Sequence, residues 1–129
     1  MEKAVVTKIG RRKLCKAHAG DIVLPKIVKM AFGDGGVDET GVEKKPSGEE
    51  TGLFHELMQK ELDGHSYPDG SEETICRYTA TVGIGECTGN YLSEIGLFDE
   101  EGDMIAIRTF LPMGKTEDIP LTFDMDEVF

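Results

Sequence analysis

One carboxylate, Glu94, lies inside an apolar stretch of the chain, directly before the run from Ile95 to Phe98. A carboxylate in such a place can act as a general acid, ligate a metal ion or accept hydrogen bonds from the backbone. General acid catalysis needs a second carboxylate or a histidine at comparable depth, and the sequence indicates no such partner. We therefore expect a structural role, in which Glu94 binds backbone N–H groups or a cation such as Arg108 and fixes a loop or a helix N-terminus against a sheet.

Cysteines and histidines are the other residues that could do chemistry. Cys15 and His18 form a C-x-x-H pair on an expected helix, and this spacing could bind zinc. A second ligand pair is missing, because Cys87 stands alone. Cys76 falls on the apolar side of an expected strand, where a thiol is usually a small hydrophobic residue. No histidine is expected beside a nucleophilic serine or cysteine, so the sequence predicts no catalytic residue, no metal ligand and no enzyme.

Two glycine-rich segments could form ligand-binding loops. The segment GIGECTG, residues 83–89, lacks the spacing and the following helix of a dinucleotide site, and glycines that relieve a bulge between strands explain it better. A loop further upstream carries Asp34, Asp38 and Glu39, which could bind calcium. It lacks the alternate-residue ligand spacing of an EF-hand, so a solvated acidic loop is expected and no cofactor is predicted.

Length and composition indicate the class of protein. The 129 residues are 39% hydrophobic and 30% charged, which predicts one globular domain over residues 1–129. No apolar run approaches the roughly 20 residues that span a bilayer, and the N-terminus lacks the apolar segment of a secretory signal. The three cysteines are widely spaced, which argues against a disulfide framework. We expect synthesis in a reducing cytoplasm and no membrane partner.

Charge is distributed unevenly along the chain. Residues 1–30 hold eight Lys and Arg against two acidic residues, a net charge of about +6. The remaining 99 residues hold six Lys and Arg against 23 Asp and Glu, a net charge of about −17. The total of −11 would repel phosphate, so nucleic acid is not an expected partner. The basic segment suits docking on an acidic protein surface, including that of a neighbouring copy.

The first half of the chain is expected to form a helix, a strand, a loop and a second helix. Residues 7–19 have the pattern of a basic amphipathic helix with Gly20 as its C-terminal cap and an apolar side made of Leu14, Cys15, His18 and Ala19. A strand over 23–32 and an acidic loop over 33–50 follow. A second helix is predicted over 51–63, with an apolar stripe of Leu53, Phe54, Leu57, Met58 and Leu62.

Antiparallel strands are expected over residues 74–123. Alternating apolar residues predict one strand over 74–84, and two more over 92–98 and 104–111 are joined by a turn with Gly102 in the left-handed conformation. Strict alternation would place Glu94 on the same face as Leu92, Gly96 and Phe98.

The segment from Pro112 to Gly114 is expected to break the sheet, and the segment DIPLTFDMDEVF could add a final edge strand. The predicted fold class is α+β, a single domain with an antiparallel β-sheet of four to five strands and two short helices.

Four motifs, taken in order, resemble a known family. The basic segment TKIGRRKLCKAHAG is followed by MAFGDGG, then by TGLFHELM and later by EIGLFDEEGDMIAI. This order resembles the N-terminal region of phage tail-collar fibre proteins, the part that attaches a tail fibre to the baseplate of a contractile tail. The resemblance covers residues 7–111, and AFGDG together with EIGLFDEEG carries most of it.

The resemblance implies a structural component of a virion tail or a phage-like particle, made in the bacterial cytoplasm. Its partners would be other tail or baseplate proteins, and a homo-oligomer, with a trimer favoured, is expected without catalysis. Family members commonly continue into long shafts, so a chain that stops at Phe129 would be a short adaptor, a truncated prophage copy or the attachment domain alone. Changing Arg11, Arg12 and Lys13 to Glu would test whether the basic helix is needed for assembly.

Two other functions remain open from the residues alone. A small cytosolic metal- or ligand-binding domain, possibly enzymatic, would use the acidic loop and Glu94, and its melting temperature would respond to calcium or zinc. A nucleic-acid-binding regulator would use the basic helix and would show a steep salt dependence of DNA binding.

Overall fold

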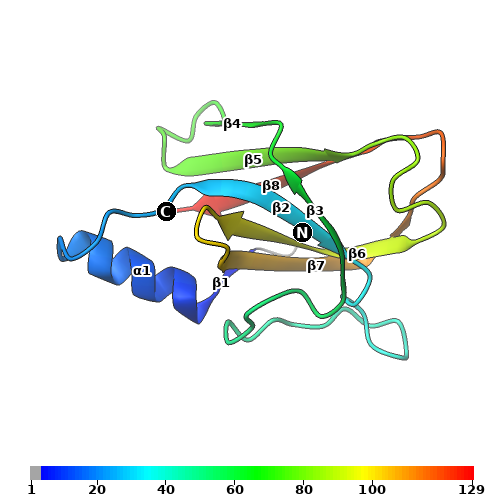
Figure 1. Cartoon of the computed structure of the whole chain (residues 1–129), viewed down its shortest axis with the longest axis horizontal. Helices are drawn as coiled ribbons and strands as arrows, with labels where there is room; N and C mark the ends of the chain where they lie inside the picture. The colour runs from blue at the N-terminus through cyan, green and yellow to red at the C-terminus, as the bar shows by residue number, and fades with distance from the viewer. Residues whose placement is uncertain (1–3) are drawn as a thin grey trace.

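Two antiparallel β-sheets pack face to face in the computed structural model, which describes residues 4–129 (Figure 1). The five-stranded sheet has the order β1-β7-β6-β2-β3, with bounds β1 Val5–Val6, β2 Ile27–Gly33, β3 Glu56–Glu61, β6 Tyr91–Asp99 and β7 Met104–Gly114. The three-stranded sheet has the order β4-β5-β8, with bounds β4 Gly64–Ser66, β5 Ile75–Val82 and β8 Leu121–Val128. The described residues form one helix, α1 (Lys8–His18), which lies at one end of the two packed sheets.

The core lies between the two sheets and follows the alternation of the strands. The inner faces of β2, β6 and β7 meet those of β5 and β8 in one cluster of buried side chains: Met30, Phe32, Leu92, Ile95, Leu97, Ala106, Ala80, Val82, Phe123 and Met125. The Phe32 and Phe123 rings join the sheets, with centroids 5.4 Å apart. Burial of this apolar surface is the main force that holds one sheet on the other.

The predicted α+β fold class is wrong, because the described chain is mainly β, with two sheets and one helix. The strand expected over 74–84 is confirmed as β5, which pairs with β8 and not with β6. The segment 83–90 carries the chain from the smaller sheet to the larger one. It turns through left-handed residues at Gly85, Cys87 and Gly89, so these glycines serve a crossover between sheets and not a bulge.

The predicted helix over 51–63 is also wrong, because residues from Glu56 to Glu61 form β3 at the edge of the larger sheet. The strand pairs with β2, with Met58 opposite Phe32 and Lys60 opposite Met30. Lys60 then donates to the backbone oxygen of Thr81, 2.8 Å away in the other sheet. A ladder of backbone hydrogen bonds thus overrides a local helical pattern of apolar residues.

Strand β7 continues through Pro112, so the expected break there is wrong. The ladder with β6 extends to Gly114 opposite Tyr91. On its other edge β7 pairs with β1 at Ala106 and Ile107. Within the described residues, β7 is paired at Pro112 with β6 alone. Proline, which has no backbone N–H to donate, is tolerated at such an edge position. The possible final edge strand is confirmed as β8.

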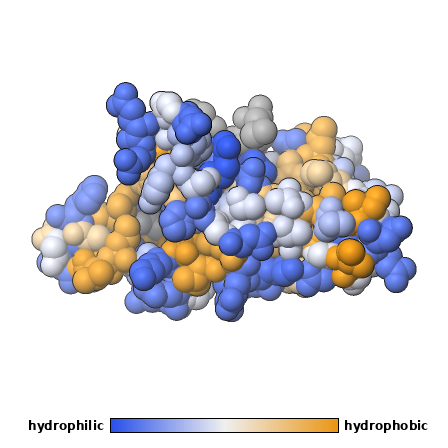
Figure 2. All heavy atoms as spheres, turned by 90° about the horizontal axis from the view of Figure 1, so that it is seen from above, coloured by the Kyte–Doolittle hydropathy of each residue, from blue (hydrophilic) through white to orange (hydrophobic). Residues whose placement is uncertain are grey.

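The outer face of the smaller sheet is a ladder of polar side chains. Arg77 binds Asp126 through two hydrogen bonds of 2.9 and 3.0 Å, and Thr79 donates to Asp124 over 2.7 Å. In the view of Figure 2 hydrophobic residues lie at both ends of the molecule and also near its middle, among hydrophilic residues. No helix over residues 4–129 is both long and apolar enough to cross a membrane.

Helix α1 forms almost as predicted, but a different side of it is buried. The Thr7 side chain accepts from the N–H of Gly10 as N-cap, and Gly20 closes the C-terminus at φ 83° with its N–H bonded to the oxygen of Ala17. The buried residues of the helix are Gly10 and Lys13. The apolar side predicted from Cys15 and its neighbours is wrong, because Cys15, His18 and Ala19 are exposed.

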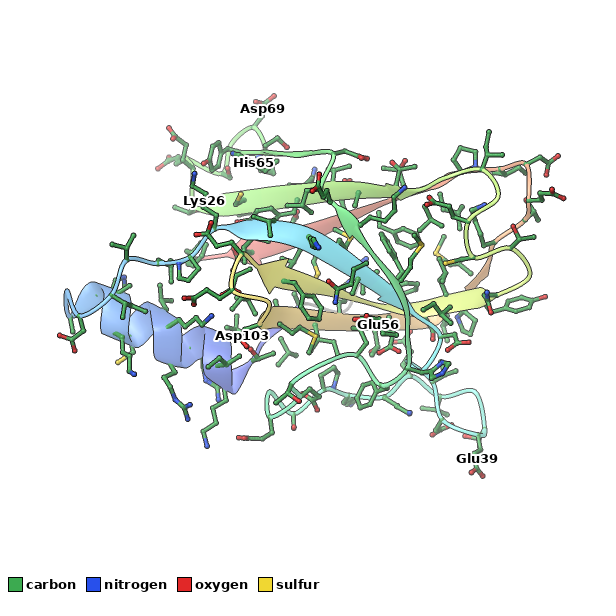
Figure 3. The ribbon with its side chains drawn as sticks, in the orientation of Figure 1. Lys26, Glu39, Glu56, His65, Asp69 and Asp103 are labelled. Carbon is green, nitrogen blue, oxygen red and sulfur yellow. The ribbon has the colours of Figure 1, made fainter. Side chains whose placement is uncertain are left out.

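Lys13 anchors the helix to the turn between β6 and β7. Its ammonium lies 2.6 Å from Asp99, 2.7 Å from Glu101 and 2.7 Å from Asp103 (Figure 3 labels Asp103). Burial alone would lower the pKa of Lys13, but the hydrogen bonds to the three carboxylates outweigh it and raise that pKa. The turn has the expected left-handed Gly102, at φ 87°.

Replacing Lys13 with Met should detach α1 from this turn. The change leaves Asp99, which is buried, beside two other carboxylates without a counter-charge, so we expect the free energy of unfolding to fall by about 3–5 kcal/mol. Urea unfolding measures it. Lys16→Met is the control, since Lys16 is exposed and its loss should change stability by at most about 0.5 kcal/mol. Equal effects of the two changes would contradict the anchoring role.

Candidate functional site

Glu94 is fully buried on β6 and holds three backbone N–H groups. Its carboxylate accepts from Phe54 at 2.7 Å, from His55 at 2.8 Å and from Gly35 at 2.9 Å. The expected binding to backbone N–H groups is therefore confirmed. Arg108 is paired with Ile95 across the ladder, so it lies on the other face of the sheet from Glu94. What Glu94 fixes is a loop, since its donors come from both ends of the segment 34–55.

A β-bulge on β6 determines which residues share a face with Glu94. The register of β6 against β7 shifts between Leu92 and Glu94, so strict alternation fails there. Leu92 packs in the core between the sheets, and the expectation that it shares a face with Glu94 is wrong. Phe98 packs in a second cluster, with Ala31, Met104 and Ile107, on the outer face of the larger sheet.

The segment 34–55 covers this outer face and is tied to it at further points. Gly36 donates to the Ser93 hydroxyl over 2.9 Å, and the Thr109 hydroxyl donates to the backbone oxygen of Lys44 over 2.6 Å. A side chain at Gly36 would overlap the backbone of Ser93, so the close approach requires glycine. The two motifs AFGDG and EIGLFDEEG, far apart in the sequence, thus meet at the Glu94 carboxylate.

Two acidic residues of the segment 34–55 bind different groups of that same segment. Asp34 pairs with the His55 ring, and the hydrogen bond and charge of Asp34 raise the pKa of His55. The Asp38 carboxylate accepts from the backbone N–H groups of Thr40 and Val42 and closes the tip of the loop. Glu39 lies exposed at that tip (Figure 3). The arrangement is that of a loop stabilised by its own carboxylates.

The cation-binding residues suggested by the sequence are not those that the fold brings together. Cys15 and His18 are exposed on α1. Within residues 4–129, the Cys, His and carboxylate atoms that gather in a group of three belong to Asp99, Glu101 and Asp103. The ammonium of Lys13 sits among these oxygens, so the chain supplies their cation itself.

A pair of titratable residues that the sequence did not indicate lies between the sheets. Tyr78 on β5 donates its hydroxyl hydrogen to Glu127 on β8 over 3.0 Å. Burial raises the pKa of Glu127, and the hydrogen bond from Tyr78 lowers it only in part. Both residues line a pocket of about 370 Å³ with walls that include Leu14, Ile27, Cys76 and Ile105. The inward position of Glu127 follows from the alternation of Phe123 and Met125 along β8, which was the available signal.

Exposed cations follow one side of α1. Lys8, Arg12 and Lys16 recur every four residues, so they form a stripe with a spacing of about 6 Å along the helix axis. Arg11 is exposed beside this stripe and donates to the backbone oxygen of Val6 over 3.2 Å. The basic surface therefore stands on a helix that is itself fixed to the body through Lys13.

Comparison with known proteins gives a consistent set of matches. The sequence model of a family described as phage tail-collar fibre protein, N-terminal, matches residues 1–123. A probable tail fiber protein of Escherichia phage P2 is 32% identical over 105 residues, which make up 81% of this chain. Those residues are 15% of the phage P2 protein, so the chain corresponds to a small part of that relative.

Glu94→Gln should loosen the segment 34–55. An amide offers one acceptor oxygen and turns an NH2 group toward backbone donors, so at least one of the three N–H groups loses its partner. We expect the free energy of unfolding to fall by about 2–3 kcal/mol, and hydrogen exchange at Phe54 and His55 to accelerate. Urea unfolding and exchange rates measure the two effects. Glu39→Gln, at the exposed loop tip, is the control, and protection unchanged by Glu94→Gln would refute the clamp.

Glu127→Gln should stabilise the protein at neutral pH. The pKa of Glu127 is higher in the folded protein than in the unfolded chain, where it is about 4.3. Glu127 therefore contributes its full stabilisation of the fold below the unfolded pKa, where the carboxyl is protonated. That stabilisation is lost as the pH rises through the folded pKa and the buried carboxyl ionises. Gln keeps an acceptor for Tyr78 without the charge. The variant should therefore melt at a higher temperature than wild type at about pH 7, and near the same temperature at about pH 4. A wild-type protein that melts higher at neutral pH would contradict this assignment.

Proposed function

The chain belongs to the phage tail-collar fibre protein family, and on that premise we propose that it attaches a tail fibre to the baseplate or collar of a contractile phage tail. Membership makes it a phage tail structural protein. We propose further that residues 1–129 act as one attachment domain, without catalysis, in contact with other tail or baseplate proteins. A homo-oligomer, with a trimer favoured, is part of the proposal.

The observation that carries the proposal is the basic stripe on an anchored helix. A docking surface needs charges held in fixed positions, because rigid groups lose less entropy on binding. The stripe formed by Lys8, Arg12 and Lys16 meets this need, since the buried Lys13 fixes the helix to the turn between β6 and β7. An acidic surface on a baseplate protein or a fibre protein would be attracted to it and oriented by it.

The stiffness of the rest of the domain supports the same function. An attachment part transmits force between two large bodies, so its surface segments should not slide on its core. The segment 34–55 is held by the buried carboxylate of Glu94 and by the Ser93 and Thr109 hydroxyls. Its backbone is thereby tied at both ends and in the middle to one sheet.

Arg12→Glu combined with Lys16→Glu should weaken attachment and leave the fold intact. Both side chains are exposed, so the melting temperature should change little, whereas reversing two charges repels an acidic partner. Lys13 is unsuitable for this test, because it is buried in the anchor of α1. Binding is measured by co-sedimentation with tail particles assembled without this protein, and we expect a loss of at least about tenfold in affinity, equivalent to about 1.4 kcal/mol.

The matched control reverses two exposed cations elsewhere, Lys29 on β2 and Lys45 in the segment 34–55. It changes the net charge equally. If the control pair reduces attachment as much as the α1 pair, attraction is general and the stripe is not the docking surface. Full attachment by the Arg12→Glu, Lys16→Glu variant would overturn the proposed role of α1.

A further inference from the structure

Large apolar side chains are exposed together at the end of the sandwich where α1 ends. They come from the loop after α1, from the residue after β4 and from the end of β8: Ile22, Val23, Leu24, Tyr67, Val128 and Phe129. Val23 is 93% exposed and Phe129 is 72% exposed. The loop after α1 and the C-terminus lie at the same end in Figure 1. Exposed apolar surface of this kind is typical of sites that contact protein or another ligand.

The pocket between the sheets opens at this same end. Leu24, Tyr67 and Phe129 belong both to the exposed cluster and to the lining of the pocket of about 370 Å³. Its walls are apolar at Leu14 and Ile105 and carry charged side chains at Lys13, Asp99 and Glu127. A dry apolar cavity of about 150 Å³ already takes up a molecule as large as benzene. The pocket therefore has room for an aliphatic side chain and the backbone that carries it.

The loop after α1 has the features of a segment that could fill such a pocket. Val23 projects into solvent at the centre of the run from Ile22 to Leu24. Asp21 precedes this run and is exposed, and Lys26, also exposed, lines the mouth of the pocket. Lys26 and His65 are labelled at this end in Figure 3. The apolar loop thus carries a negative charge at Asp21, and the lining of the pocket includes an exposed positive charge at Lys26.

We propose that this end joins copies of the chain to one another: the loop 21–24 of one copy enters the pocket of the next, with Val23 in the pocket and Asp21 beside the neighbour's Lys26. Apolar fit and opposite charges favour a second copy as the occupant. Each copy carries one loop and one pocket, and in the proposed arrangement it gives its loop to one neighbour and receives a loop from another. Contacts of this head-to-tail type close into a ring when the rotation allows. This inference rests on the proposed homo-oligomeric attachment role and assigns its interface.

Val23→Asp tests the interface in the full chain. A carboxylate that enters between the apolar walls of the pocket and beside Glu127 is strongly disfavoured, so the variant should have the monomer mass of 14.1 kDa by light scattering at concentrations where wild type has a multiple of it. Ile84→Asp is the matched control, because Ile84 is 70% exposed in the segment 83–90 and outside the proposed interface. It should keep the wild-type mass. A monomeric wild type, or an oligomeric Val23→Asp variant, would overturn the inference.

Cross-linking gives a second test of which residues meet. In a chain with Cys15, Cys76 and Cys87 changed to Ala, one variant carries Val23→Cys and another carries Tyr67→Cys. Mixing the two under mild oxidation should give a covalent dimer of mixed composition, because Val23 of one copy lies near the pocket rim of the next. A covalent yield no greater than that of Ile84→Cys mixed with Tyr67→Cys would overturn the assignment.

The failure of this inference is distinguishable from failure of the proposed function. The Arg12→Glu, Lys16→Glu variant should attach more weakly to tail particles and retain the oligomeric mass. Retention of attachment in that variant counts against the role of α1 alone. Retention of the oligomer in Val23→Asp counts against the loop-in-pocket interface alone.

Discussion

A buried carboxylate that satisfies three backbone N–H groups is the constraint around which this fold is arranged. Glu94 occupies the middle strand of the larger sheet, and its donors come from Gly35, Phe54 and His55. Burying a charge without such partners would be costly, so the carboxylate and the loop depend on each other. The consecutive N–H groups of Phe54 and His55 both point at the carboxylate, so the chain bends there before it continues as β3 from Glu56.

Patterns of neighbouring residues predicted the strands and turns that depend on interactions between residues close together in the sequence. Alternation located β5, β6 and most of β7, and the glycines at 20 and 102 marked turns that need a left-handed residue. The helix over 51–63 was predicted from apolar spacing that a strand satisfies equally well once β2 offers its edge. The division into two sheets depends on β5 choosing β8, a pairing between segments about 45 residues apart, which no local pattern encodes.

The candidate functional surfaces were likewise predictable only where they depend on residues close together in the sequence. The basic character of α1 was visible in the sequence, and so was the structural role of Glu94. The burial of Lys13 was not visible, because its partners lie 86 and 88 residues further along the chain. The pocket was not visible either, since its lining comes from α1, from both sheets and from the C-terminal residue. In each case the deciding contacts are between segments that are distant in sequence.

The N-terminal elements of this chain find their partners only near its other end. The hydroxyl of Thr7, directly before α1, bonds the backbone oxygen of Met104, and β1 pairs with residues of β7. During synthesis from the N-terminus, α1 leaves the ribosome early and stays undocked until β7 has been made. The pocket also needs β8, so it is completed last. The proposed self-association through it would therefore begin only after almost the whole domain has been translated.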